Sequence, residues 1–125
     1  KISSYHEKIR LLGKIDDSEK NKMIQNCQIF LIPSRSEGMP LTFFEALEYD
    51  KIICSTKVGD IENIIKDSNI GIIIPQKTKI SISKTLENLI LNPMEFSLDD
   101  KKNIFNDYTI NKTVNLIETR INKHD

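Results

Sequence analysis

Glu37 and Glu45 are the residues best suited to chemistry in this chain, and they stand eight positions apart around a glycine-proline turn. A carboxylate accepts hydrogen bonds from two hydroxyl groups, which suits the vicinal diol of a ribose or a hexose. Gly38, next to the first glutamate, would let the backbone approach a ligand closely because it has no Cβ. Pro40 is suited to the first position of a helix, where its missing N–H costs nothing.

The segments around the turn are expected to be a buried strand, from Ile29 to Pro33, and an apolar helix that contains the second glutamate. Ligands of open α/β sheets bind outside the carboxyl ends of the strands. The first N–H groups of the helix, around Leu41 to Phe43, have no partner inside it, and the helix dipole attracts anions there. A phosphate-bearing ligand fits this place, with Glu37 facing it from the strand side and Glu45 lying beside whatever extends from the phosphate.

Each glutamate taken alone is more commonly a solvated side chain or a local cap than a ligand contact. The ligand-binding interpretation depends on the complete order of strand, Pro-Ser, Glu-Gly, Pro-Leu and an apolar helix with a second glutamate. That order resembles the E-x7-E signature of the retaining, nucleotide-sugar-dependent glycosyltransferases of the GT-B fold, known as family 4 or group 1. The matching segments are Pro33-Ser34, Glu37-Gly38, Pro40-Leu41, Glu45-Ala46-Leu47, Ile52 to Thr56, Val58-Gly59, Glu62 to Ile65 and Asn69 to Pro75, with Arg10 to Gly13 upstream.

The resemblance implies a role for each matching residue. Glu45 would accept hydrogen bonds from the ribose hydroxyls of the donor nucleotide, and Glu37, the candidate catalytic residue, would contact hydroxyls of the transferred sugar. The other candidate donor-binding residues are Gly38, Met39, Pro40, Leu41, Thr42 and Gly59. The donor would be a nucleoside diphosphate sugar such as a UDP- or GDP-sugar, transferred with retention as in a hexosyltransferase. No metal and no further cofactor are expected, because the helix terminus and cationic side chains would stabilise the leaving diphosphate.

Two neighbouring positions allow more than one interpretation. The Val58-Gly59-Asp60 turn is either a plain strand-to-helix turn with Asp60 as the cap, or a loop that approaches the sugar diphosphate. Lys57 is either a surface charge or a weak phosphate contact.

Family members usually have glycine after the motif helix, where this chain has Asp50, a residue that tolerates the left-handed conformation better than most.

The alternation of apolar runs and helical patterns predicts an α/β fold, a Rossmann-like parallel sheet flanked by helices. Expected strands are Ile9 to Gly13, Gln28 to Ile32, Lys51 to Ser55 and Ile70 to Ile74; expected helices are Ser18 (as N-cap) to Asn26, Pro40 to Tyr49, Ile61 to Lys66, Ser81 to Leu91, one that starts at Ser97 and one that starts at Thr109.

At 125 residues the chain is expected to be one domain, the distal part of a GT-B C-terminal domain. Residues 1–76 would bind the nucleotide sugar and residues 77–125 would form a helical tail. The N-terminal acceptor domain and the basic residues with which the family grips the diphosphate are expected to be absent. The chain would therefore be the donor-binding part of an enzyme that a separate N-terminal half or subunit completes. The alternative is a catalytically inactive nucleotide-sugar-binding or subunit-association module.

The composition of the chain argues against several classes of partner and of protein. Lys and Arg together number 18, as do Asp and Glu, so no overall charge favours nucleic acid or an acidic membrane surface. No apolar stretch approaches the length of an integral membrane segment. Cys27 and Cys54 lack metal-site spacing and are expected to be reduced, buried thiols. The resemblance implies a cytoplasmic protein of polysaccharide biosynthesis, with a peripheral position at the inner membrane face as an option.

Overall fold

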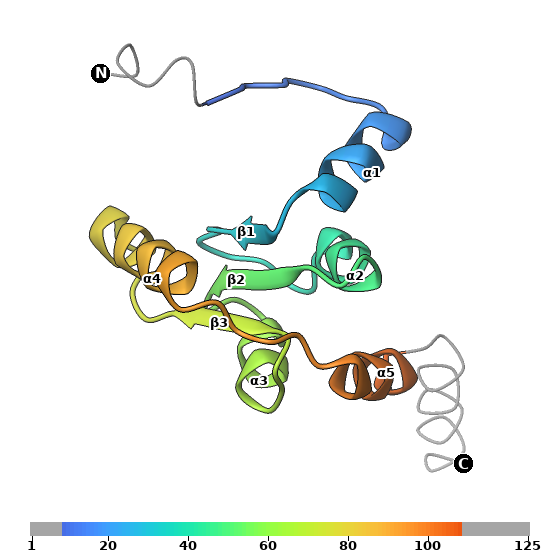
Figure 1. The fold of residues 1–125 in the computed structure, drawn as a ribbon, viewed down its shortest axis with the longest axis vertical. Coiled ribbons are helices and arrows are strands. Elements are labelled where there is room, and N and C mark those ends of the chain that lie inside the picture. Colours follow the sequence, from blue (N-terminus) through green and yellow to red (C-terminus); the bar gives the residue numbers. More distant parts are fainter. Residues whose placement is uncertain (1–8, 109–125) are drawn as a thin grey trace, which may run out of the picture.

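The computed structural model describes residues 9–108, in which three parallel strands form a sheet with helices on both faces (Figure 1). The elements in chain order are α1 (Asp17–Asn26), β1 (Ile29–Ile32), α2 (Leu41–Glu48), β2 (Ile52–Thr56), α3 (Ile61–Lys66), β3 (Gly71–Ile74), α4 (Lys79–Leu91) and α5 (Leu98–Asp107). The strand order is β1-β2-β3, so strands that follow one another along the chain are also neighbours in the sheet. The predicted parallel Rossmann-like sheet is therefore confirmed.

The side chains of β2 alternate between two hydrophobic clusters, as the pleat of a strand requires. Ile53 points into the larger cluster, which α2 and α3 cover with Phe43, Leu47 and Ile61. Cys54 points into the smaller cluster on the opposite face, which α4 covers. Burial in that cluster raises the pKa of the Cys54 thiol to about 11. This central strand is buried on both faces, which explains its short apolar run.

Most predicted elements are confirmed to within two residues at their ends. α3 has the predicted bounds, and Ser97 is the N-cap of α5, where its Oγ accepts a hydrogen bond from the Asp100 N–H at 3.1 Å. Asp50 follows α2 with a φ of 57°, the left-handed conformation expected of it. Its carboxylate and the Glu48 carbonyl both bind Lys101 Nζ, which ties α5 to the end of α2.

Two expected helix caps differ from the structure. Asp16, not Ser18, caps α1, with its Oδ1 accepting a hydrogen bond from the Glu19 N–H at 2.8 Å. Both residue types make good caps, and the acidic one two positions earlier adds a full charge beside the helix dipole. Asp60 occupies the predicted position before α3, but its side chain makes no capping hydrogen bond.

The strand expected from Ile9 to Gly13 is wrong: these residues form no strand, and Gly13 adopts a φ of 65°. Leu11 is 85% exposed. In a doubly wound sheet of order 3-2-1-4-5-6, the third strand lies at the edge of the sheet, and two other strands stand between it and the fourth. If β1, β2 and β3 correspond to the fourth, fifth and sixth strands of this order, residues 9–13 correspond to the third. The strand that would pair with them is then not among those of the described part of the chain. The helix expected from Thr109 lies outside the described residues.

Candidate functional site

The loop of residues 33–40, which carries the first glutamate, lies at the carboxyl end of β1 and is fastened to the neighbouring strand. Thr56, fully buried at the end of β2, donates its hydroxyl to the Ser34 carbonyl at 2.5 Å and lies 3.3 Å from the Ile32 carbonyl. Lys77, just after β3, donates to the Arg35 carbonyl. Backbone carbonyls of the loop are thus bound by side chains from both other strand ends.

Thr56→Val is expected to lower the free energy of unfolding by about 1–2 kcal/mol, because it removes the donor that the fully buried Thr56 supplies to the Ser34 carbonyl. Urea denaturation of the full chain measures this loss. Thr85→Val is the matched control, since Thr85 is only half-buried and donates to the Ser81 carbonyl within its own helix. Equal losses in the two variants would contradict the proposed anchoring of the loop.

The second glycine turn packs directly on the first. Gly59 has a φ of 47°, and a Cβ added to it would lie 1.7 Å from the Gly38 carbonyl oxygen and 3.0 Å from that of Glu37. The structure therefore brings together two segments that lie far apart in the sequence. By contrast, a Cβ added to Gly38 would meet nothing within 4 Å, so this glycine borders open space.

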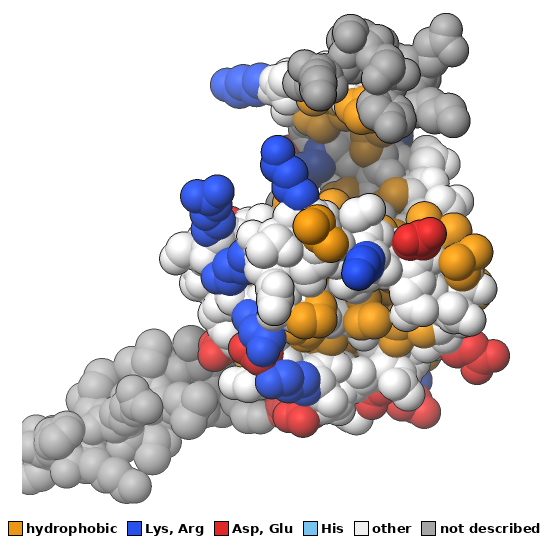
Figure 2. All heavy atoms as spheres, turned by 90° about the vertical axis from the view of Figure 1, so that its left-hand side faces the viewer, with side chains coloured by type: hydrophobic (Ala, Val, Ile, Leu, Met, Phe, Trp, Pro, Cys, Tyr) orange, Lys and Arg blue, Asp and Glu red, His pale blue; other side chains and the backbone are white. Residues whose placement is uncertain are grey.

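Glu37 is exposed, and its Oε1 accepts a hydrogen bond from Ser34 Oγ at 2.9 Å. The contact fixes one carboxylate oxygen within the loop. Exposed Arg35, Lys57 and Lys77 lie in the three loops at the carboxyl ends of the strands. Figure 2 views the molecule from the side toward which the strands point in Figure 1, and lysine and arginine side chains gather on this face.

The N-terminus of α2 carries no side-chain cap. Pro40 was expected as the first helical residue, but it occupies the cap position, with an extended ψ of 133°. Phe43 N–H donates to the Pro40 carbonyl at 3.0 Å, so the expected set of free N–H groups is reduced to those of Leu41 and Thr42. Met39 packs its side chain against the core, which leaves only its backbone for a ligand.

Glu45 lies in the second turn of α2 and forms an ion pair that the sequence did not indicate. Its Oε1 lies 2.8 Å from Lys20 Nζ, which projects from α1. Its Oε2 is buried and has no hydrogen-bond partner. The hydrogen bond to Glu45 and a second one to Asp17, 3.1 Å away, raise the pKa of Lys20. A partner 25 residues away could not be found from the motif, because it depends on how α1 packs on α2.

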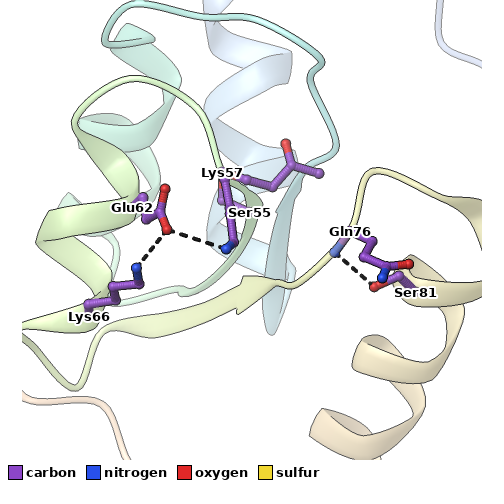
Figure 3. Close-up of polar contacts among 7 residues, drawn as sticks. Ser55, Lys57, Glu62, Lys66, Gln76 and Ser81 are labelled. Atoms are coloured by element: carbon purple, nitrogen blue, oxygen red, sulfur yellow. Dashed lines mark hydrogen bonds and ion pairs between the residues drawn. The ribbon is translucent and has the colours of Figure 1, made fainter.

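Lys57 pairs with Glu62, as Figure 3 shows, which favours a surface charge over a phosphate contact. Its Nζ lies 3.6 Å from Glu62 Oε1, and Lys66 Nζ approaches the same oxygen at 2.6 Å. The hydrogen bond from Lys66, assisted by the charges of both lysines, lowers the pKa of Glu62. The adjacent loop after β3 is closed by a hydrogen bond from the Gln76 N–H to Ser81 Oγ at 3.2 Å.

Neither a metal cluster nor a membrane-spanning helix occurs in the described part of the chain. No group of three or more His, Cys, Asp or Glu side chains in residues 9–108 could hold a metal ion. Over the same residues, every helix is too short or too polar to cross a bilayer. A mainly apolar cavity of about 620 Å³ opens between Ile29, Ile52 and Leu89, at the amino ends of the strands and away from the two glutamates.

The first strand of the parallel sheet ends in a glycine turn, with one glutamate in the turn and one in the next helix. This arrangement is that of a Rossmann-like α/β fold with a candidate ligand site at the carboxyl ends of its strands. Comparison with known proteins gives the family: residues 3–111 match the glycosyl transferases group 1, and the chain belongs to this family.

Relatives and a solved structure support the same assignment. An uncharacterized glycosyltransferase of Methanocaldococcus jannaschii is 27% identical over 84 residues, which cover 67% of this chain and 24% of that protein. One subunit of the phosphatidylinositol N-acetylglucosaminyltransferase of Homo sapiens is 27% identical over 101 residues, covering 81% of this chain and 20% of the relative. The sucrose-phosphate synthase of Thermosynechococcus elongatus superposes with a TM-score of 0.64 at 16% identity, covering 74% of this chain and 24% of the synthase. The fold is thus that of a GT-B glycosyltransferase domain, and the chain spans a quarter or less of these proteins.

Proposed function

We propose that this chain forms the donor-binding part of a glycosyltransferase that uses a nucleoside diphosphate sugar. The observation that carries the proposal is the second carboxylate oxygen of Glu45, which is buried without a partner. Buried polar atoms are nearly always hydrogen-bonded in native proteins, and an unpaired one costs free energy. A ligand hydroxyl would supply the missing hydrogen bond. The ribose diol of a nucleotide has the donors that Glu45 lacks.

The other groups of the site would contact the rest of the donor. The N–H groups of Leu41 and Thr42, at the uncapped end of α2, suit the diphosphate, because a helix N-terminus attracts anions. Gly38 borders open space through which the backbone can meet the ligand. Glu37 is exposed beside it and has its Oε2 available for hydroxyls of the transferred sugar.

The reaction would be transfer with retention of configuration at the anomeric carbon. The bond between this carbon and the diphosphate oxygen breaks, and a bond to the acceptor oxygen forms on the same face of the sugar. The proton of the acceptor hydroxyl leaves with the departing nucleoside diphosphate. Backbone N–H groups at the start of α2 would stabilise the charge that develops on the diphosphate, and the proposal requires no metal for this purpose.

The acceptor would be bound by a separate part of the enzyme, either an N-terminal half or another subunit. Support comes from the share of the relatives that this chain spans and from the human relative, whose name describes one subunit of an enzyme. A cytoplasmic enzyme of polysaccharide assembly, working at the inner membrane face, is the setting we propose. A module that binds the nucleotide sugar without transferring it is the alternative, and transfer after addition of the completing part distinguishes the two.

Gly38→Ala provides the test of donor binding. A methyl group on Gly38 points into open space, so the free energy of unfolding should stay within about 0.5 kcal/mol of that of the parent chain. The same methyl group would occupy the space of the ligand and weaken binding of UDP- or GDP-sugar about tenfold. Ligand-observed NMR on the full chain measures the affinities. A stable variant that binds the donor as tightly as the parent chain would contradict the proposed placement of the ligand.

A further inference from the structure

The carboxylate of Glu45 is engaged on one oxygen only. Lys20 Nζ lies 2.8 Å from Oε1, whereas Oε2 has no partner, although the side chain as a whole is 31% exposed. The same ammonium group lies 3.1 Å from Asp17, one turn earlier on α1. Lys20 is thus paired with two carboxylates, one on α2 and one on its own helix.

The cation at one oxygen has a consequence for the other. The hydrogen bond to Oε1 restricts rotation of the carboxylate, so that Oε2, which also accepts hydrogen bonds, keeps one direction. An acceptor that is charged and held in place loses little freedom when a hydroxyl donor binds to it.

The local charge identifies the kind of group that would bind. Two carboxylates, Asp17 and Glu45, surround one lysine, so the cluster carries a net charge of about −1. A phosphate would be repelled from this place, whereas neutral hydroxyl groups would bind as donors. The cluster is therefore suited to the sugar of the nucleotide and not to its diphosphate.

We propose that Lys20 is a positioning residue for the donor nucleotide: it holds the Glu45 carboxylate so that Oε2 receives the ribose hydroxyls. Lys20 itself touches neither the sugar nor the reacting atoms. The inference rests on the proposed donor site and adds a residue of α1, outside the motif, that determines the preference for a ribose.

The test compares binding of UDP or GDP, whichever binds the parent chain more tightly, with binding of its 2′,3′-dideoxy analogue. Lys20→Met is expected to weaken binding of the ribonucleotide about tenfold and to leave the affinity for the analogue unchanged. The ratio of the two affinities, which measures the preference for ribose, should therefore approach one. Lys20→Arg keeps the cation and should keep most of the preference. Lys22→Met, which removes an exposed lysine on the same helix, is the matched control and should behave like the parent chain.

The possible outcomes distinguish a failure of this inference from a failure of the proposed function. An undiminished preference for ribose in folded Lys20→Met would overturn the role of Lys20 and leave donor binding intact. The role of Lys20 would also be overturned if the parent chain bound the ribonucleotide and its dideoxy analogue with equal affinity, since Glu45 would then make no hydrogen bond to the ribose hydroxyls. Failure of the parent chain to bind any nucleotide would overturn both proposals. If Lys20→Met does not fold, Asp17→Asn should lower the preference about threefold, and an unchanged preference would contradict the inference.

Discussion

Gly59→Ala is expected to lower the free energy of unfolding by about 3 kcal/mol, the largest loss of stability among the substitutions considered. Two effects add up at this position. The left-handed φ of 47° is unfavourable for alanine, and its Cβ would lie 1.7 Å from the Gly38 carbonyl oxygen. The Gly38 carbonyl is part of the backbone and cannot rotate away as a flexible side chain can. The loop that carries Glu37 would therefore have to move. Urea denaturation of the full chain measures the change in stability.

Gly13→Ala separates the two effects. Gly13 also has a left-handed φ, of 65°, but a Cβ added there meets nothing within 4 Å. This control should lose only the conformational part, about 1 kcal/mol. Equal losses at the two glycines would show that the contact between the two turns contributes nothing. The loop displaced by Gly59→Ala should also bind the donor less tightly than the parent chain.

Glu45→Gln is expected to weaken binding of the donor nucleotide about thirtyfold, which corresponds to about 2 kcal/mol for a hydrogen bond to a charged group. The amide has nearly the same shape as the carboxylate but presents an NH2 group where one oxygen stood. One ribose hydroxyl would then face a donor instead of an acceptor. Ligand-observed NMR with UDP, GDP and their sugar conjugates measures the loss.

Glu48→Gln is the matched control for this variant, because Glu48 is exposed at the end of the same helix. It should bind the nucleotide as the parent chain does. A Glu45→Gln chain that is folded and retains full affinity would show that this carboxylate does not contact the ligand. The family membership would then stand without a donor site at this position.

Much of the fold could be predicted because it depends on local signals. The apolar runs of the strands and the cap at Ser97 follow from a few neighbouring residues, and the left-handed Asp50 follows from the glycine that the family usually has at this position. The strand expected at residues 9–13 failed for a non-local reason. A short apolar run becomes a strand only beside another strand, and none adjoins these residues in the described structure.

The candidate site divides in the same way. The sequence predicts that Glu37 and Gly38 lie in the loop directly before α2, and the structure confirms this position. It could not show that Gly59 packs on Gly38, nor that Lys20 binds Glu45, because these contacts join different elements. The motif itself gives no signal for Lys20. Met39 was expected to contribute its backbone N–H to the site, and its side chain packs against the core.

We propose that the donor binds at the start of α2, between the two glycine turns and Glu45. The most direct test is a titration of the 15N-labelled chain with UDP-sugar and GDP-sugar, followed through the backbone amide signals. The largest shifts are expected at Gly38, Leu41, Thr42 and Gly59. Shifts confined to the opposite end of the strands, around Cys27 and Met94, or no shifts at all in a folded sample, would contradict it.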